Sequence, residues 1–374
     1  MKKLIVLSVV FALVATAAFA VDLSASVFGL VVPVQSDNSE GAEIKSSGGF
    51  QRARFDGYGE VADGEFGGWI RFGGSFNAYA FWKPADWFKM VIGGNPDGMY
   101  GKEGVTGWML HENPYDAGVA IFGGNVWGGG MTPSIKTRDA FYGGYGDNAL
   151  HLNFNFLENM IGLNLILPFW GDSWAPGHEI SDMLGNITAQ LDLNLAFGNI
   201  AITFDSNKSG DDTGGKVYAY LGMPIGPLGL DFGVGYGFNN GDNNEPIAIG
   251  LGLKFAADAF GIRFRAVTTV GDAFNLLAEL VPYFAFTDKI TAFLGIGVGY
   301  AGAGYDWKDY STDPATTKHT DDGTIDFYVN PYVRIGEEWG AQFLVGFQLY
   351  SKQGLSGDYS TINWALPIAI MLSF

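Results

Sequence analysis

Alternation of apolar and polar residues is the strongest pattern in this chain, and residues 187–197 show it most clearly. Ile187, Ala189 and Leu191 alternate with Thr188 and Gln190, and the same order continues to residue 195. Successive side chains of a β-strand point to opposite faces of the sheet, so a period of two predicts a strand with one apolar and one polar face. Thirteen segments from residue 148 onward follow this rule. They are 150–156, 161–169, 187–197, 199–205, 216–223, 228–237, 247–255, 261–270, 275–286, 289–300, 325–335, 340–350 and 361–374.

Five further strands are predicted before residue 148, which gives a total of eighteen. They are 22–34, 48–61, 66–73, 75–83 and 87–95. The weakest point is Gly73-Gly74, which we interpret as a tight turn between two strands. If these glycines are a bend within one strand, another strand must lie within 96–147, so an even total of 16 or 18 is expected either way.

The connections between these strands alternate in length, which predicts an antiparallel up-and-down arrangement. Short turns are expected at 157–159, Asn199, 224–227, 256–260, 287–288 and 336–339. Longer polar connections are expected at 170–186, 206–215, 238–246, 301–324 and 351–360, with 271–274 as a short exception. Most strands are eight to fourteen residues long, close to the roughly 9–11 residues that a tilted strand needs to cross a bilayer. A soluble β-sandwich is the alternative, and it would bury the apolar faces that a membrane barrel turns toward lipid.

Two local features resemble a known family. The alternating segment 361–374 ends on Phe374, which resembles the C-terminal assembly signal of Gram-negative outer-membrane β-barrels. The turn 83–86 is flanked by Trp82 and Trp87, as in hairpins of porin-type proteins, where interfacial aromatic residues form a girdle. The resemblance to the general porin type implies an all-β transmembrane barrel of 16–18 strands, with short periplasmic turns and long extracellular loops.

The same resemblance implies where the protein works and with what. It implies the outer membrane of a diderm bacterium, with contacts to lipid and lipopolysaccharide. Phe374 would be the signal read by the barrel-assembly machinery. The implied function is a water-filled channel for passive diffusion of small hydrophilic solutes, and general porins often form homotrimers.

Composition is compatible with an exported membrane barrel. Residues 1–20 have the basic start, apolar stretch and Ala18-Phe19-Ala20 site of a cleaved signal peptide, which leaves 21–374 as the barrel. The chain has no Cys, so it can be neither a lipoprotein nor a disulfide-bonded domain. Only 16% of residues are charged, and 15% are aromatic. Loss of Lys2 and Lys3 changes the formal charge from −18 to −20, which argues against nucleic acid as a partner.

Residues 96–147 are the one long stretch without clean alternation. In general porins a long loop early in the chain folds into the lumen, so by resemblance this segment is a candidate constriction loop. Glu112 and Asp116 would then face the narrowest part of the channel. The alternative is an ordinary extracellular loop that contains a short hairpin such as 117–125.

Six arginines fall on the alternate strand positions whose side chains point to the polar face. They are Arg52, Arg54, Arg71, Arg263, Arg265 and Arg334. An arginine that faces lipid near the bilayer centre costs about 2–4 kcal/mol, so these side chains are predicted to line the pore. Two roles are compatible with that position. The arginines can pair with inward acids such as Asp56, Asp192, Asp231 and Glu279, or they can attract anions into the channel.

Sites for other chemistry have little support in the sequence. The four His residues are scattered without zinc-binding spacing, no G-x-S-x-G motif occurs, and no cofactor is expected. Acid-rich loops such as 239–245 are more simply solvated turns than Ca²⁺ sites. A non-enzymatic porin is therefore the predicted function. Its alternatives are a channel selective for a sugar or a hydrophobic compound, and a surface adhesin or structural barrel with a closed lumen.

Overall fold

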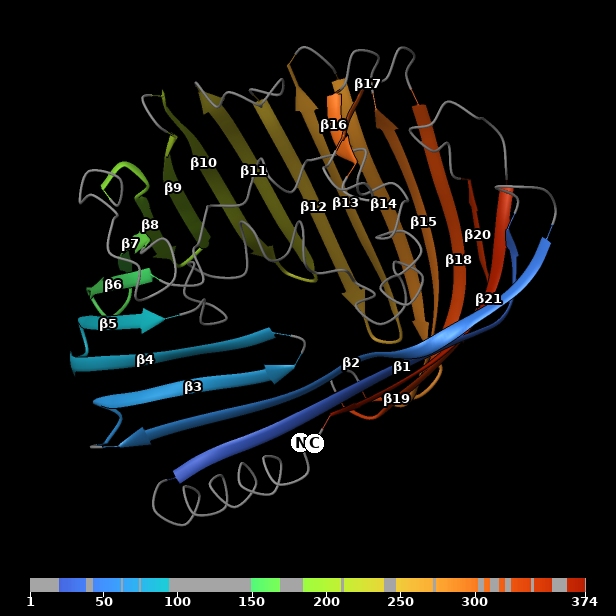
Figure 1. The fold of residues 1–374 in the computed structure, drawn as a ribbon, viewed down its shortest axis with the longest axis horizontal. Helices are drawn as coiled ribbons and strands as arrows, with labels where there is room; N and C mark the ends of the chain where they lie inside the picture. Colours follow the sequence, from blue (N-terminus) through green and yellow to red (C-terminus); the bar gives the residue numbers. More distant parts are fainter. Residues whose placement is uncertain are drawn as a thin grey trace.

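The chain forms one closed antiparallel β-barrel in the computed structural model (Figure 1). The structure describes residues 20–37, 43–61, 63–73, 75–93, 149–168, 184–209, 212–238, 247–271, 274–301, 306–309, 316–319, 324–337, 340–351 and 362–373. No helix in this described part of the chain is both long and apolar enough to cross a membrane.

The strands follow one another along the chain with few interruptions. The first ten are β1 Ala20–Asp37, β2 Glu43–Val61, β3 Phe66–Gly73, β4 Ser75–Ala85, β5 Phe88–Gly93, β6 Ala149–Phe156, β7 Ile161–Pro168, β8 Thr188–Leu195, β9 Gly198–Ser209 and β10 Asp212–Ile225. The remaining strands are β11 Leu228–Phe238, β12 Ile247–Ala257, β13 Phe260–Val270, β14 Phe274–Ala285, β15 Ile290–Ala301, β16 Asp306–Asp309, β17 Thr316–His319, β18 Thr324–Gly336, β19 Gln342–Gly346, β20 Gln348–Ser351 and β21 Ile362–Ser373.

Eighteen positions around the barrel wall, which we call staves, are occupied by the described strands. The main sheet has nineteen strands, but β19 and β20 are two parts of one stave interrupted at Phe347. Both parts pair with β18 on one side and β21 on the other. The short strands β16 and β17 form a separate hairpin between β15 and β18. The predicted total of 16 or 18 is therefore confirmed at its upper value.

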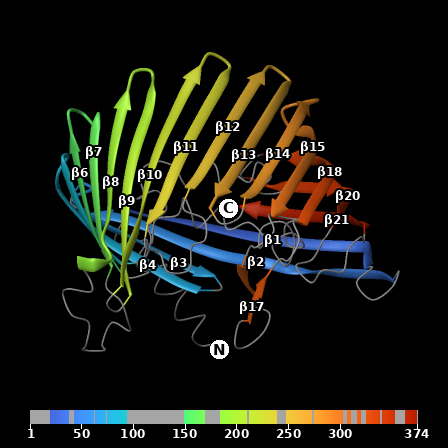
Figure 2. The ribbon, with the colours of Figure 1, turned by 90° about the horizontal axis from the view of Figure 1, so that it is seen from above.

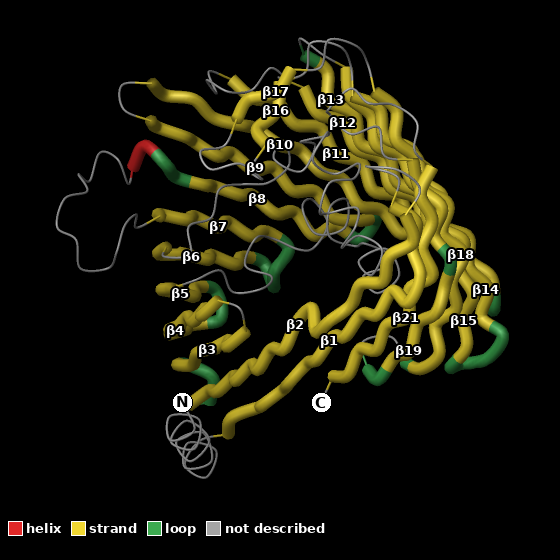
Figure 3. The backbone as a smooth tube through the Cα atoms, turned by 45° about the vertical axis from the view of Figure 1, so that its right-hand side comes forward, coloured by secondary structure: helices red, strands yellow, loops and turns green. Residues whose placement is uncertain are grey.

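Pairing between β1 and β21 closes the ring. Ser26 lies opposite Ser373 and Gln35 lies opposite Ala365, so β1 pairs with the last strand over most of its length. The other edge of β1 pairs with β2, and Figures 1 and 3 show these two long strands beside the C-terminal staves. The sheet consequently has no free edge at the chain's two ends.

Every consecutive pair of staves forms a hairpin, and the two ends of the barrel differ in the length of their connections. One end carries only short turns, such as residues 226–227 and 258–259. At the opposite end, β5 stops at Gly93 and β6 begins at Ala149, and β15 stops at Ala301 and β18 begins at Thr324; Figure 2 shows the short turns gathered together at their own end. In bacterial barrels the short turns face the periplasm. The predicted alternation of connection lengths is confirmed except between β9 and β10, where only residues 210–211 separate the two strands.

The structure corrects the predicted strand ends of two hairpins. Residues 206–215 were expected to form a long polar loop, but β9 continues to Ser209 and β10 begins at Asp212. The first hairpin also extends further than predicted, to the Asp37–Glu43 pair. The ends of these strands are polar on both faces, because a strand that projects beyond the lipid needs no apolar face. The alternation of apolar and polar residues therefore does not detect them. The turn at Gly73-Gly74 is confirmed, since Gly73 pairs with Ser75.

Aromatic side chains mark the rim at the short-turn end. Trp82 and Trp87 are 37% and 54% exposed, and they flank the turn after β4 as predicted. Phe66 stacks against Trp82 at 6.4 Å between ring centroids. Trp82 Nε1 donates a hydrogen bond to Glu65 Oε1 at 3.2 Å, so the ring has an apolar face and a polar edge. Such side chains suit the membrane–water interface.

Inward glycines make room for aromatic rings on neighbouring staves. Gly297 of β15 lies opposite Tyr328 of β18, and a Cβ on Gly297 would be 2.1 Å from Tyr328 Cε1. The same relation holds for Gly261 and Tyr283, where the corresponding distance to Tyr283 Cζ is also 2.1 Å. The run Gly295-Ile-Gly-Val-Gly299 therefore relieves crowding on the inner wall, as its parity predicts.

We expect Gly297→Ala to destabilise the barrel by about 1–3 kcal/mol, because the new methyl group would overlap the buried ring of Tyr328. Gly295→Ala is the matched control, since its Cβ would be 3.4 Å from Tyr328 Cε2, an ordinary contact. The measurement is the temperature at which each purified variant loses its folded band in SDS gel electrophoresis. Equal melting of the two variants would show that Tyr328 moves freely out of the way.

Candidate functional site: the inner wall of the barrel

The inner wall carries most of the polar side chains of the staves. On β8, Gln190 and Asp192 are 4% and 8% exposed, whereas Leu191 between them is 37% exposed. On β9, Thr203 is 4% exposed and its neighbour Ile202 is 44% exposed. Large apolar residues thus cover the outside of the barrel and polar residues turn inward. This order is the reverse of a soluble β-sandwich and is the arrangement of transmembrane barrels.

Six inward side chains form a continuous row across β5 to β10, which we call the polar belt. They are Lys89, Asn153, Asn164, Gln190, Thr203 and Tyr218, each directly opposite the next in register. Gln190 accepts a hydrogen bond from Thr203 Oγ1 at 3.0 Å. Gln190 and Asn164 both donate to the carboxylate of Asp192, at 2.8 and 2.7 Å. Amides and hydroxyls therefore dominate this part of the wall.

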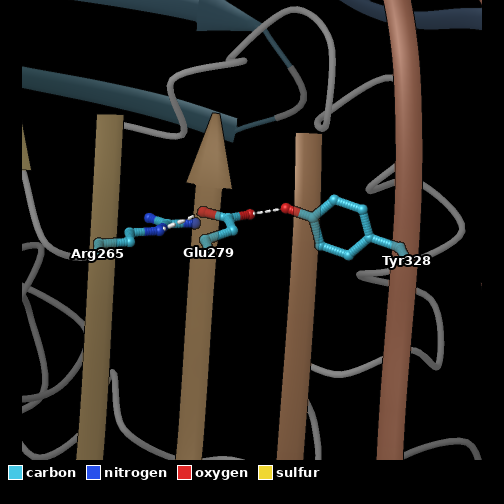
Figure 4. Close-up of polar contacts among 3 residues, drawn as sticks. All are labelled: Arg265, Glu279 and Tyr328. Carbon is cyan, nitrogen blue, oxygen red and sulfur yellow. Dashed lines mark hydrogen bonds and ion pairs between the residues drawn. The ribbon is translucent and has the colours of Figure 1, made fainter. Parts of the chain in front are cut away.

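A second row joins four staves through an ion pair and a tyrosine (Figure 4). Arg265 of β13, Glu279 of β14, Gly297 of β15 and Tyr328 of β18 lie opposite one another in register. Arg265 Nε donates to one oxygen of Glu279, and the Tyr328 hydroxyl donates to the other oxygen. The Arg265 and Glu279 side chains are 15% and 4% exposed. Gly297 allows the tyrosine ring to pass over β15 and reach the carboxylate.

A third group combines aromatic rings with charges on β2 to β4. Arg71 Nε donates to Asp56 Oδ1 at 2.6 Å, across the β2–β3 pair. The Arg71 guanidinium also lies 4.4 Å from the centroid of the Trp69 ring. Trp69 stacks on Tyr79 at 5.5 Å, which places two adjacent rings beside the ion pair. Arginine favours such stacking because its planar group is weakly hydrated.

A fourth group lies nearer the short-turn end of β13 to β18. Phe293 and Tyr332 stack almost in parallel at 4.6 Å, and Phe293 also contacts Tyr283 at 5.7 Å. Arg334 lies over Phe293 at 5.3 Å, and Arg263 lies over Tyr283 at 5.5 Å. Phe293 is buried and Tyr283 is half-buried, and these are the two rings that lie beneath the guanidinium groups.

The structure describes four of the six predicted arginine side chains. Arg71 and Arg265 pair with Asp56 and Glu279, two of the acids named from the sequence. Asp231 instead accepts a hydrogen bond from the Tyr220 hydroxyl. Arg52 and Arg54 lie on β2, but their side chains are outside the described part.

The other predicted site residues, Glu112, Asp116 and Phe374, also lie outside the described residues. Tyr328, Tyr220 and the polar belt were not predicted as site residues. Their inward parity was visible in the sequence, but their partners depend on the register between strands.

A metal centre is not assembled on the described wall. No three His, Asp or Glu side chains come together there in a way that could hold a metal ion. The carboxylates of Asp56, Glu279 and Asp231 are instead engaged by arginine or tyrosine.

Comparison with known proteins gives a likeness in fold. No family model matches this chain. No curated protein matches it in sequence either. The solved structure of OccK11 (OpdR) from Pseudomonas aeruginosa matches with a TM-score of 0.56 and 10% identity, over 95% of this chain and 97% of that one. OccAB4 from Acinetobacter baumannii matches with a TM-score of 0.52 and 9% identity, over 95% and 98% of the two chains. The chain therefore has the fold of Gram-negative outer-membrane β-barrels of the porin type.

The Arg265–Glu279 pair gives a test of the inner wall. We expect Glu279→Leu to destabilise the barrel by about 3–5 kcal/mol, because it leaves a buried guanidinium without its carboxylate. The double variant Arg265→Leu with Glu279→Leu should recover part of this loss, since it removes both charges. Urea unfolding monitored by tryptophan fluorescence measures four proteins, namely the wild type, Glu279→Leu, Arg265→Leu and the double variant. A double variant as unstable as the sum of the singles would show that the two side chains act independently.

Proposed function

We propose that the protein forms a water-filled channel in the outer membrane of a diderm bacterium, through which small hydrophilic solutes diffuse passively. The observation that carries this proposal is the closed ring of eighteen staves with apolar residues outside and polar residues inside. Rings of about 16–18 strands leave an aqueous channel, whereas rings of about eight are filled by their own side chains. Such transport requires neither a cofactor nor covalent chemistry, and we propose that the protein is not an enzyme.

Charged residues of the wall support a role in ion selectivity as well as in stability. Arg71 and Arg265 hold acids across neighbouring staves, which is a structural role. Arg263 and Arg334 lie over aromatic rings. Fixed positive charge inside a pore raises the local concentration of anions. We propose that Arg263 and Arg334, together with Arg52 and Arg54, set the preference of the channel between anions and cations, whereas Arg71 and Arg265 are neutralised by the acids that they hold.

Other parts of the proposal come from the family resemblance. We propose that residues 96–147, with Glu112 and Asp116, narrow the channel; β5 and β6, which this segment connects, are adjacent staves. We also propose cleavage of residues 1–20, recognition of Phe374 by the assembly machinery, contacts with lipopolysaccharide, and a homotrimer.

The proposed channel predicts stepwise ion conductance. Purified protein added to a planar lipid bilayer in KCl should produce discrete current steps, because a ring of this size encloses a continuous aqueous path. The heat-denatured protein is the control. If folded protein inserts without any conductance, the protein is an adhesin or structural barrel with a closed lumen, and neither a general nor a selective channel.

The arginines of β2 predict a shift in selectivity. Arg52→Ala combined with Arg54→Ala should shift the reversal potential in a KCl gradient toward cations, because fixed positive charge is lost. The shift should shrink at high salt, since the Debye length falls to about 3 Å at 1 M. Gln51→Ala, a neutral change on the same strand, is the matched control. An unchanged reversal potential at low salt would assign the two arginines a purely structural role.

A further inference from the structure

The ladder of backbone hydrogen bonds is not equally continuous around the barrel. Between β12 and β13 it runs without interruption from the Ile247–Val270 pair to the Ala257–Phe260 pair. From β14 through β15, β18, β19–β20 and β21 to β1, the pairing is interrupted at several places, and a proline lies at each of them. Cohesion between neighbouring staves is therefore lower in this part of the wall.

The break between β19 and β20 lies opposite Pro331 of β18. Phe347 N donates a hydrogen bond to Pro331 O at 2.9 Å. In an antiparallel pair of this kind the two residues normally exchange two hydrogen bonds. Proline has no N–H, so the second bond, back to the Phe347 carbonyl, cannot form. The carbonyl of Phe347 thus lacks its ladder donor.

A second proline acts on the other edge of the same stave. The pairing of β19 and β20 with β21 places Gly346 opposite Pro367. Phe347 faces β18, and the next residue of a strand directs its N–H and C=O to the other neighbour, so Gly346 faces β21. Pro367 has no N–H to donate to the Gly346 carbonyl. Two successive carbonyls of one stave therefore lack their ladder donors.

Two further interruptions fall on the same level of the wall. The pairing of β14 with β15 lapses around Pro282. Leu294, which the register places beside Pro282, lies opposite Pro331. On β1 the register with β21 shifts around Pro33, at the level of Pro367. We call this row the proline line, and its members are Pro282, Pro331, Pro367 and Pro33.

Prolines inside a closed sheet weaken it, because each removes one ladder hydrogen bond. Gly346 and Phe347 lie at the middle of the stave that β19 and β20 form. In the hydrocarbon layer no water is present to replace a missing donor, so an unpaired carbonyl is especially costly there. The closed form of the wall is consequently least favourable at this level.

Two amide side chains beside the proline line are buried without full hydrogen bonding. Asn330 is 0% exposed, and neither its Oδ1 nor its Nδ2 has a partner among the described residues. Gln348, which the register places opposite Asn330, is 1% exposed, and its Oε1 has no partner there either. Burial without a partner is unfavourable, and these atoms gain water only when the wall opens. They therefore favour a local opening at the same level as the missing ladder bonds.

Cohesive clusters lie on both sides of the proline line. On the side away from the short turns, the Tyr328 hydroxyl donates to Glu279 and joins β18 to β14. On the short-turn side, Phe293 and Tyr332 stack at 4.6 Å and join β15 to β18. Pro331 lies between Tyr328 and Tyr332 on β18, so the weak level separates two well-connected parts of the wall.

We propose that the proline line is a hinge in the barrel wall. The parts of β18, β19–β20 and β21 on the two sides of the line move as separate packed units, and the ladder opens between them at Gly346 and Phe347. Because these staves line the lumen, the movement changes the bore of the barrel. The hinge rests on the ladder alone, whereas its effect on ion flow rests on the proposed channel function.

Hydrogen exchange tests the hinge independently of conductance. In the folded protein in lipid vesicles, the backbone amides of residues 343–350 should exchange at least threefold faster than those of 262–269 on β13, because local opening releases hydrogen-bonded amides. Both segments lie within staves, and the β12–β13 ladder is continuous. A smaller difference, or faster exchange on β13, would overturn the hinge.

Restoring the missing donors should close the hinge. Pro331→Val and Pro367→Ala each supply an N–H, so each should slow exchange of residues 343–350 at least threefold. Pro224→Ala is the matched control, because Pro224 pairs with Gly229 on β10 and β11, outside the line, and this change should leave that exchange unaltered. Exchange as fast in both variants as in the wild type, with all proteins folded on unheated SDS gels, would overturn the assignment to the prolines.

Single-channel recording tests the effect on the bore. In a planar bilayer in KCl, the wild type should show brief transitions between current levels, and Pro331→Val combined with Pro367→Ala should make them at least threefold rarer. A steady wild-type current, or unchanged transitions in a double variant whose exchange has slowed, would overturn the effect of the hinge on the bore. Fast exchange of residues 343–350 in a protein without any KCl current would support the hinge and refute the proposed channel.

Discussion

Backbone hydrogen bonding in lipid is the constraint on which this structure depends. An unpaired N–H or C=O in the hydrocarbon layer costs several kcal/mol, so a membrane sheet has to close on itself. Here closure falls on β1 and β21, the first and last staves. Their pairing contains a register shift between Val31 and Val34, and the β1–β2 pairing contains another between Phe28 and Gly29. Such irregularities bend a strand, which allows the long β1 to follow both neighbours around the ring.

Closure also decides what the inner wall can do. Once the register is fixed around the ring, side chains far apart in the sequence become direct neighbours along the hydrogen-bonding direction. Glu279 and Tyr328 are 49 residues apart, and they meet because β15 between them offers Gly297 at the crossing point. A one-residue slip of β15 would replace this glycine with Ile296 or Val298 and send the large side chain inward. Gly297 therefore fixes the register of β15 and also leaves room for the Tyr328 ring.

The sequence predicted the staves well because lipid imposes a simple rule on them. Leu191 beside Asp192, or Ile202 beside Thr203, could be assigned to outer and inner faces without any knowledge of their partners. Strand ends that project beyond the lipid do not follow that rule, which is why the sequence pattern predicts a loop from Ser206 to Gly215 where the structure has paired strands. The site was harder to predict because it depends on register. Parity alone placed Arg265 and Glu279 on the wall, but it could not show that Tyr328 completes their contact.

Local charge on the wall differs from what the whole chain suggests. The formal charge of −18 would indicate a strong attraction for cations if it were spread over the channel. The described wall instead pairs Arg71 with Asp56 and Arg265 with Glu279, and it supports Arg263 and Arg334 on aromatic rings. Because charges beyond about 10 Å are largely screened at 0.1 M salt, the local charge beside this wall is set by these paired residues rather than by the formal charge of the whole chain. On the β2–β3 side the Arg71–Asp56 pair lies beside the Trp69 ring, so the charge there is balanced although the chain as a whole is acidic.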